Sequence, residues 1–571
     1  MLLHPNKTNF SHLDTESQEI MRQTISFFEN KGKEKLMEDD RHLVWYADFL
    51  EFVKENRIFA KLMTPAGYGA EGSRWDTSRI AAFTEICGFY GLCYWYTYQV
   101  SSLGLGPIWM SGNEEIKQKA AALLEEGNIF AFGLSEKEHG ADIYSSGMFV
   151  TPKADGTYSA NGSKYYIGNG NKAAIVSVFG KMADTDDYVF FAVDSQHANY
   201  KLIKNTVNSQ SYVSEFKLED YPLTEADILH KGRDAWDAAL NTVNVNKYNL
   251  GWGSIGICTH AMYETITHAA NRNLYGKFVT DFPHVKALLT TAYTRLMAMK
   301  LFALRATDYM RTASAEDRRY LLFVPMVKMK VTTEGEHVIN DMWDVMAAKG
   351  FEKDMYFNMA ARDIRALPKL EGTVHVNMAL IIKFMPNYFF NPGEFPEIPT
   401  FHNPTNDDFL FNQGPTKGLG GIQFHNYYHV YKSVNLPNVN VFKEQIKVLR
   451  EALMAAGPDE KQQKDIDFLL TVGELFTLVV YGQLILENAK LYNVEDDLVD
   501  QMFEVFVSDF SRFALELGNK PSSSEKQQQY ATKMIRKPIY NTARTARIWD
   551  KHVYAMKESY AMNPVASSVS A

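Results

Sequence analysis

The spacing of hydrophobic residues changes twice along this chain of 571 residues. Between about residues 15 and 130, apolar side chains recur three and four positions apart, as at Ile80, Phe83, Ile86 and Cys87, which predicts amphipathic helices. From about residue 130 to residue 229 they alternate with polar residues in short runs rich in Val, Tyr and Phe, which predicts strands. Helical spacing returns over residues 234–385 and 441–562. This order predicts an α+β fold in which helical regions flank an all-β insert of about one hundred residues.

Local signals refine this division. Residues 111–127 should form one helix, because Asn113 can cap its start and a glycine stands at its end. The dipeptides Asp155-Gly156 and Asn161-Gly162 both predict hairpin turns. Four prolines within residues 392–404 predict a connecting loop. We therefore expect an N-terminal helical domain (1–130), a β-domain (131–233), a helical-bundle domain (234–388), a connecting loop (389–430) and a helical extension (431–571).

Composition narrows the class of protein. Lys and Arg number 59 against 68 Asp and Glu, and this mild acidity argues against a nucleic-acid binder. A hydrophobic fraction of 46% and a charged fraction of 22% exclude a disordered or collagen-like chain. Three scattered cysteines cannot form a disulfide framework and fit a reducing compartment. The most apolar segment, residues 475–486, is too short by this estimate to span a bilayer, so we expect no transmembrane segment. We also expect a cytoplasmic protein.

Several motif-like strings have a structural explanation. Residues 168–173 spell a dinucleotide-binding pattern, but a strand-like run follows them, so a β-turn is the better interpretation. His425 and His429 stand four apart and could bind a metal, although Tyr427 and Tyr428 between them favour packing. No GxSxG elbow is present, so serine hydrolysis has no candidate nucleophile. We also expect no metal site.

Four further segments resemble the acyl-CoA dehydrogenase family by their order and spacing over about residues 15–385. The fourth is the most specific, because Arg362-Asp363, a short gap and then Glu371-Gly372-Thr373 match the signature that carries the family's catalytic base. The segments are Ala131–Gly147, Asn161–Gly170, Asn271–Val285 and Asp344–Asn377. The resemblance implies a helical N-terminal domain, a β-barrel-like central domain and a C-terminal four-helix bundle, here followed by an extra helical domain.

The resemblance also implies a reaction, the FAD-dependent dehydrogenation of an acyl-CoA to the trans-2-enoyl-CoA in fatty acid metabolism. Glu371 would remove the α-proton while flavin N5 accepts the β-hydride. Such a base needs burial to raise its pKa toward neutrality, and Leu370 and Gly372 beside it suit a dry, close approach. A minority of family members place the base elsewhere, at the position of Asn246, but asparagine cannot act as a base.

Flavin contacts carry over first to the β-domain. Leu134 and Ser135 match groups that hold the isoalloxazine ring, and Tyr166 takes the place of a Trp that stacks on it. Gly168 departs from the family, which has a Ser or Thr there whose hydroxyl bonds near N5.

Other flavin contacts would serve the cofactor of a neighbouring subunit. Arg272 matches the arginine that reaches its pyrophosphate, with Tyr275 as the aromatic companion. The usual Gln-x-x-Gly-Gly run is replaced by Asp344–Ala348, while Thr373 is retained near the adenine end and His375 replaces a Gln. These positions imply a homo-oligomer.

Substrate positions depart from the family more mildly. Ala141 replaces a Ser that contacts the pantetheine arm, and Lys247 replaces an Arg. Trp95, Tyr96 and Tyr98 fall on the helix that closes the acyl pocket, where they either narrow the pocket for a short or medium acyl group or pack between helices.

The helical extension resembles the long forms of the family and implies a homodimer, with an electron-transferring flavoprotein as the electron acceptor. Two alternatives stay open. One is an acyl-CoA oxidase or a flavin monooxygenase-like relative. The other is a non-catalytic binding protein on the same fold, suggested by the departures at Gly168, Ala141 and Asp344.

Overall fold

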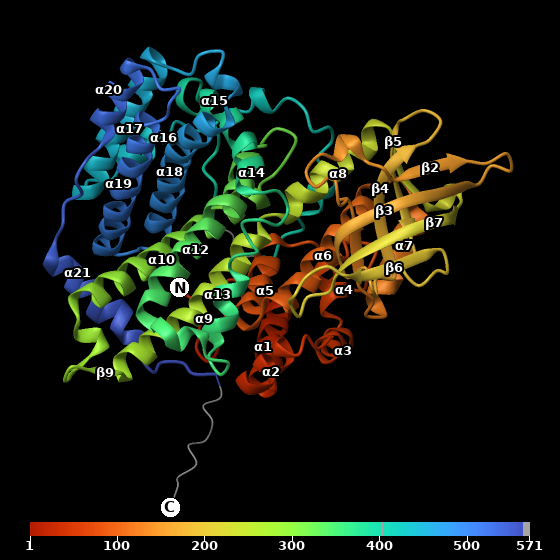
Figure 1. Cartoon of the computed structure of the whole chain (residues 1–571), viewed down its shortest axis with the longest axis horizontal. Coiled ribbons are helices and arrows are strands. Elements are labelled where there is room, and N and C mark those ends of the chain that lie inside the picture. The colour runs from red at the N-terminus through yellow and green to blue at the C-terminus, as the bar shows by residue number, and fades with distance from the viewer. Residues whose placement is uncertain (401–403, 563–571) are drawn as a thin grey trace, which may run out of the picture.

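A computed structural model of the protein describes residues 1–400 and 404–562. Helices form most of the molecule, and a β-sheet lies at one side of it (Figure 1). Residues 401–403 of the expected loop and residues 563–571 of the expected helical extension lie outside the described residues. The helices before the sheet are α1 (Thr15–Lys31), α2 (Lys33–Arg41), α3 (Ala47–Glu55), α4 (Ile58–Met63), α5 (Thr77–Tyr90), α6 (Leu92–Met110) and α7 (Glu114–Glu125).

The predicted helix at residues 111–127 is confirmed as α7. Asn113 Oδ1 accepts a hydrogen bond from the Ile116 amide at 3.2 Å, as expected of an N-cap residue. Helices α5 and α6 are buried on all sides, since they run through the centre of the molecule between the sheet and the later helices (Figure 1).

The β-region forms one mixed sheet of eight strands in the order β6-β7-β3-β2-β4-β5-β8, with β1 paired in parallel to β4. The turn predicted at Asp155-Gly156 is confirmed and joins β2 to β3. The β-turn predicted within residues 168–173 is also confirmed, since the Lys172 amide donates to Asn169 O at 3.0 Å. The strands are β1 (Phe130–Gly133), β2 (Phe149–Pro152), β3 (Tyr158–Gly168), β4 (Ile175–Met182), β5 (Tyr188–Val193), β6 (Tyr200–Asn205), β7 (Val213–Leu223) and β8 (Ile228–Lys231).

The hairpin turn predicted at Asn161-Gly162 is wrong. Both residues lie inside β3, where the register with β7 shifts between Ala160 and Gly162. Gly162 is needed at this bulge because a β-carbon would come within 2.8 Å of Met148 Cα. The dipeptide signal therefore marks a bulge in a continuous strand.

The helices after the sheet form a bundle around α9, α10 and α12. A short hairpin of β9 (Asn273–Leu274) and β10 (Lys277–Phe278) follows α9, and a π-helical turn at Val327–Val331 joins α11 to α12. The helices of this region are α8 (Arg233–Asn246), α9 (Asn249–Asn271), α10 (Pro283–Arg311), α11 (Tyr320–Met326), α12 (Thr332–Met346), α13 (Tyr356–Asp363), α14 (Val374–Ile381) and α15 (Met385–Phe390).

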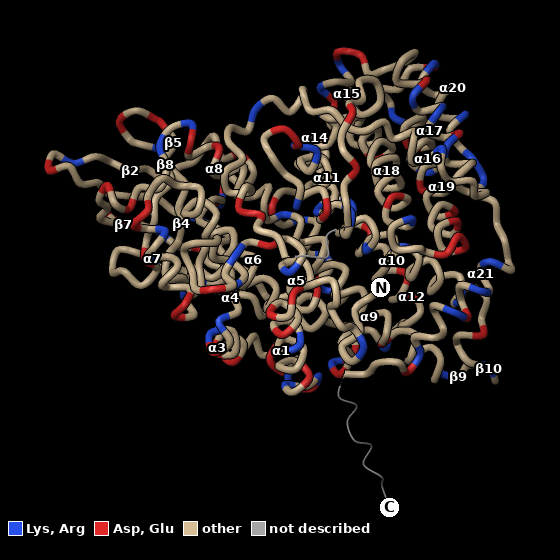
Figure 2. The backbone as a smooth tube through the Cα atoms, turned by 180° about the vertical axis from the view of Figure 1, so that it is seen from behind, with Lys and Arg blue, Asp and Glu red and all other residues tan. Residues whose placement is uncertain are grey.

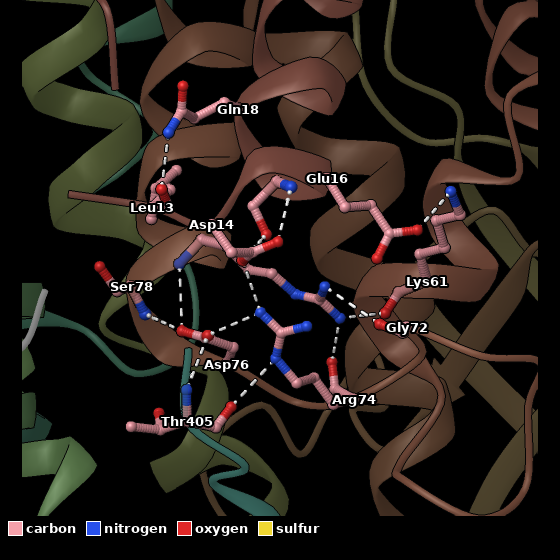
Figure 3. A network of polar contacts seen from close by, with 12 residues as sticks. Leu13, Asp14, Glu16, Gln18, Lys61, Gly72, Arg74, Asp76, Ser78 and Thr405 are labelled. Atoms are coloured by element: carbon pink, nitrogen blue, oxygen red, sulfur yellow. Dashed lines mark hydrogen bonds and ion pairs between the residues drawn. The ribbon is translucent and has the colours of Figure 1, made fainter. Parts of the chain in front are cut away.

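The connecting segment after α15 returns to the N-terminal domain and is fastened there by a polar network (Figure 3). Arg74 donates to Thr405 O at 3.2 Å and to Asp14 at 2.8 Å. Asp76 caps α5 and also accepts from the Thr405 amide at 3.2 Å. These bonds give the charged groups beneath the connecting segment their hydrogen-bond partners. They also hold the connecting segment against the start of α5.

The extension consists of α16 (Tyr427–Lys432), α17 (Pro437–Ala455), α18 (Ile466–Leu491), α19 (Asp496–Gly518), α20 (Glu525–Met534) and α21 (Thr542–Ile548). Its attachment to the bundle includes a buried ion pair of Arg295 on α10 with Asp509 on α19, at 2.8 Å. His429 lies on α16 and His425 precedes that helix, and no group of three potential metal ligands occurs in the described part of the chain.

The expectation that the apolar segment of the extension is too short to span a bilayer is wrong. It belongs to α18, whose 26 residues and mean hydropathy of 1.8 meet the length and composition of a membrane span. However, 83% of its most apolar window is buried inside the fold, as in the core helix of a helical bundle. Gly473 of α18 packs against α14, where a β-carbon would meet Met378 Sδ at 2.3 Å.

Candidate active site

Glu371 lies in the short loop between α13 and α14. Its φ of 52° and that of Gly372, 86°, place two consecutive residues in the left-handed region, which a non-glycine residue adopts at a cost of about 1 kcal/mol. Thr373 then caps α14 by accepting from the Val376 amide. A strained non-glycine residue at a helix start is typical of a position held for function.

The Glu371 carboxylate has one firm partner, Gln99 of α6. Gln99 Nε2 donates to Glu371 Oε1 at 2.6 Å and also to Asn246 O at 3.1 Å. Gln99 Oε1 accepts from Asn249 Nδ2 at 2.9 Å, so the amide of Gln99 is held in one orientation. Glu371 Oε2 is buried and has no hydrogen-bond partner among the described residues, so one acceptor oxygen of this carboxyl group is left unsatisfied.

Burial sets the acidity of this carboxyl. Burial raises the pKa of Glu371 to about 7, against the opposing effects of the Gln99 hydrogen bond and of the Lys328 and Lys247 ammonium groups. Burial likewise lowers the pKa of Lys247 to about 8 and that of Lys328 to about 7. Three titratable groups near neutrality in one place are typical of a catalytic site.

Lys328, on the π-helical turn, holds the loop that carries Glu371. Its Nζ donates to Pro368 O at 2.7 Å and to Gly372 O. Asn377 of α14 donates to Gly372 O at 3.0 Å and accepts from Lys247 Nζ at 3.3 Å. These bonds tie both ends of the loop to buried side chains, which compensates the strained backbone at Glu371.

Sequence reasoning missed Gln99, Asn249, Lys328 and Asn377. A signal for Lys328 was present, because it stands in the otherwise apolar run LLFVPMVKM, and a charged residue in such a run requires a buried partner. Asn246, weighed as the alternative base position, is fully buried, and its backbone oxygen accepts from Gln99 Nε2. Its side chain accepts from Ser102 Oγ and donates to Thr242 O, so it acts as a structural amide.

The predicted β-domain residues come together where β1 ends beside β3. Ser135 Oγ donates to Tyr165 O at 2.7 Å, and the Tyr165 amide donates to Ser135 O at 3.0 Å. Leu134 O accepts from Lys164 Nζ at 3.0 Å. Tyr166 has a φ of 64° and is 60% exposed, so this aromatic residue lies at the surface beside these strands.

Helix α6 connects the two halves of the site. Tyr96, one turn before Gln99, lies against Gly168 at the end of β3. Burial, and then the nearby Glu371, raise the pKa of the Tyr96 phenol. By contrast, Tyr98 packs between Phe59 and Phe83 with ring distances of 5.6 and 5.2 Å, and Trp95 is fully buried beside Gly253. Of the three aromatic candidates on α6, Tyr96 is therefore the one that reaches the site, and Trp95 and Tyr98 pack between helices.

A second group of predicted residues lies far from Glu371. Arg272 follows the last residue of α9, whose length of 23 residues corresponds to about 34 Å from the end beside Gln99. Tyr275 is 95% exposed on the β9–β10 hairpin, on the opposite side of the molecule from the sheet (Figure 1). Asp344 and Ala348 are exposed at the end of α12, and His268 lies within electrostatic reach of both Arg272 and Lys349. Tyr275, Asp344 and Ala348 are exposed and Arg272 is half-buried, and none of the four is among the groups that act on Glu371 of the same chain.

The remaining candidates border the loop or the sheet. Leu370 is partly buried beside Glu371, His375 is exposed on the first turn of α14, and Ala141 is exposed in the segment between β1 and β2. Acidic and basic residues are interspersed over both the sheet and the helices (Figure 2).

Comparisons with known proteins bear on the family and the fold. Residues 234–385 match the family model described as "Acyl-CoA dehydrogenase, C-terminal domain". An acyl-CoA dehydrogenase of Bacillus subtilis is 25% identical over 328 residues, covering 56% of this chain and 85% of the relative. Residues 234–385 are thus similar to the C-terminal domain of the acyl-CoA dehydrogenase family, and the comparisons support this family for the chain. The predicted family and fold are thus confirmed.

Further proteins that are similar to this chain differ in name and length. A 3-(aryl)acrylate reductase of Clostridium sporogenes is 23% identical over 376 residues, covering 64% of this chain and 98% of the relative. A crystal structure of an acyl-CoA dehydrogenase complexed with FAD from Bacillus anthracis has a TM-score of 0.76 at 18% identity and covers 98% of this chain and 97% of that one. Butyryl-CoA dehydrogenase from Megasphaera elsdenii has a TM-score of 0.56 at 21% identity and covers only 64% of this chain. The helical extension is therefore a shared feature of some family folds and not of others.

Proposed function

We propose that this protein is an FAD-dependent acyl-CoA dehydrogenase in which Glu371 is the catalytic base. The observation that carries the proposal is Glu371 Oε2, a buried carboxylate oxygen with no partner among the described residues, on a group whose pKa burial raises to about 7. A base with this pKa is half ionised at neutral pH and becomes a sufficiently strong acceptor for an α-proton of a thioester.

The residues present fit a flat conjugated ring. Tyr166 offers an exposed aromatic face next to the ends of β1 and β3, where Leu134, Ser135 and Gly168 lie. FAD bound there would supply the acceptor for the β-hydride. Gln99 orients the carboxylate, Lys328 and Asn377 hold its loop, and Lys247 adds positive charge beside it. Glu371 Oε2 then takes the α-proton in a water-poor position.

The exposed surface around Arg272 and Tyr275 supports a homodimer. Arg272 lies across the molecule from Tyr166, so one chain cannot bring both residues to one flavin. An arginine and a nearly fully exposed tyrosine are suited to the pyrophosphate and ring system of a cofactor held by a second copy. A relative named as a subunit of a caffeyl-CoA reductase-Etf complex, and a similar solved structure whose title names an electron transferring flavoprotein, support such a flavoprotein as the redox partner of this enzyme.

The test is an anaerobic titration of the purified, FAD-loaded protein with acyl-CoAs of graded chain length, followed through the flavin absorbance. Bleaching by one length class is expected, and Glu371→Gln should retain FAD yet fail to bleach. Rapid reoxidation of the bleached flavin by oxygen would instead favour an acyl-CoA oxidase. Failure of the wild-type protein to take up FAD would contradict the proposal and favour a binding protein.

A further inference from the structure

Gly168 has no room for a side chain, and the reason is Tyr96. A β-carbon at position 168 would lie 2.6 Å from Tyr96 Cε1, 2.8 Å from Tyr96 Oη and 2.8 Å from Val100 Cγ1. Real β-carbons essentially never approach neighbours this closely. The backbone at Gly168 does not have a positive φ, so its conformation alone does not require glycine. The glycine is required by the two α6 side chains that pack against it.

The Tyr96 hydroxyl stands close to the space that a side-chain oxygen at position 168 would occupy. Because its Oη lies 2.8 Å from the site of the absent β-carbon, the phenol fills the volume of the missing side chain. Tyr96 Oη has no hydrogen-bond partner among the described residues, although the whole residue is only 7% exposed. Tyr94 and Tyr98 of the same helix also have unpaired hydroxyls, but theirs are enclosed by protein, whereas Tyr96 Oη is not. A buried tyrosine with an unpaired, accessible hydroxyl is arranged to bind a group from outside the chain.

The protonation state of Tyr96 suits a donor. Burial and the neighbouring Glu371 both favour the neutral phenol and raise its pKa, so the hydroxyl keeps its proton at neutral pH. Tyr96, Gln99 and Val100 share one face of α6, since residues three and four apart are neighbours on a helix. The helix that orients the base through Gln99 therefore also presents this hydroxyl to the side of the site formed by β3.

We propose that Tyr96 supplies to the isoalloxazine ring the hydroxyl hydrogen bond that the family resemblance assigns to a Ser or Thr at the position of Gly168. This inference rests on the proposed function, because it requires FAD to bind beside β3. Tyr96 is thus a cofactor-contacting residue, and Gly168 is the substitution that makes room for it. The glycine at position 168 and the tyrosine at position 96 thus belong together, because the hydroxyl group lost from β3 is supplied by α6.

The first test removes the hydroxyl and keeps the ring. Tyr96→Phe should leave the thermal unfolding temperature unchanged and weaken FAD binding by roughly two- to tenfold, the effect of one neutral hydrogen bond. The reduction potential of the bound flavin should fall and its absorbance band should shift, because a donor stabilises the more negatively charged reduced ring. Tyr98→Phe, which removes an enclosed hydroxyl from the same helix, is the matched control and should change neither property.

The second test exchanges the two positions. Gly168→Ser alone should lower FAD content and thermal stability, because its β-carbon overlaps Tyr96 and Val100. Combined with Tyr96→Ala it should recover part of the lost FAD content and shift the potential toward that of the wild type, since the Tyr96 overlap is removed and a hydroxyl returns at position 168, while the Val100 overlap remains. Such non-additivity is what direct contact between the two side chains predicts.

The outcomes separate the two proposals. A wild-type protein that binds FAD, together with a Tyr96→Phe variant of identical spectrum and potential, overturns the role of Tyr96 and leaves the proposed function intact. A Gly168→Ser variant as stable and as rich in FAD as the wild type also overturns the exchange. A wild-type protein that binds no FAD overturns both proposals.

Discussion

Gln99→Met should displace the pH dependence of catalysis toward higher pH. Gln99 Nε2 donates to Glu371 Oε1 at 2.6 Å and so stabilises the ionised carboxylate. Methionine has a similar length and is apolar, so it fills the same volume but cannot donate. Without the donor, the charged form of Glu371 is less stable and its pKa rises above the value of about 7 that it has in the intact site.

The magnitude follows from the strength of a hydrogen bond to a charged group. Such a bond contributes about 1.5–3 kcal/mol, which corresponds to about one to two pKa units. The pKa of Glu371 should therefore rise from about 7 to about 8–9 in the variant. At pH 7 the ionised fraction then falls from about one half to about 1–10%, so proton abstraction slows by about 5- to 50-fold. Raising the pH to about 9–10 should restore most of the rate.

The assay is anaerobic stopped-flow measurement of flavin reduction at saturating acyl-CoA across this pH range. Gln445→Met is the matched control, because Gln445 is a fully buried glutamine of α17 in the extension whose amide donates to Val507 O and Met534 O. The control should lose stability without moving the pH profile. If a Gln99→Met variant keeps its flavin and its apparent pKa is unchanged, the idea that Gln99 stabilises the ionised form of Glu371 is refuted.

Two further predictions concern Glu371 and Arg272. Glu371→Gln should stabilise the fold, and more so at high pH. Below the ordinary pKa of 4.5, the carboxyl of Glu371 is protonated in both the folded and the unfolded state, so its burial costs no ionisation energy. Above about pH 7, ionisation of this carboxyl in the folded state costs about 3 kcal/mol, and glutamine removes that cost. Urea unfolding at pH 5 and pH 8 measures this, and a variant whose advantage is equal at both pH values would contradict the burial argument. Arg272→Ala should lower the FAD content of the purified protein through loss of a charge-assisted contact, whereas Arg22→Ala, which changes an exposed arginine on α1, should not. Flavin content equal to that of the wild type would exclude the contact across the subunit boundary.

Local patterns predicted local structure well where a single interaction decides the outcome. The capped helix α7 and the turn at Asp155-Gly156 both follow from residues adjacent in sequence. The same kind of signal was wrong at Asn161-Gly162, because pairing of β3 with β7 over eleven-residue strands outweighs the turn preference of a dipeptide. The length of α18 was also misjudged. Gly482 and Gln483 interrupt the apolar run of residues 475–486 in the sequence, but both are buried inside the long helix α18.

The sequence by itself determined the order of helical and β-regions, the family, and Glu371 as the candidate base, because these depend on residue types at fixed spacings. Only the tertiary structure decided what makes Glu371 basic. Its hydrogen-bond donor Gln99 is 272 positions away, and Lys247 and Lys328 reach it from two further elements. The exchange between Tyr96 and Gly168 was equally hidden, since it depends on the contact of a helix with a strand. A pKa and a packing contact are set by what surrounds a group in space, and spacing along the chain does not contain that information.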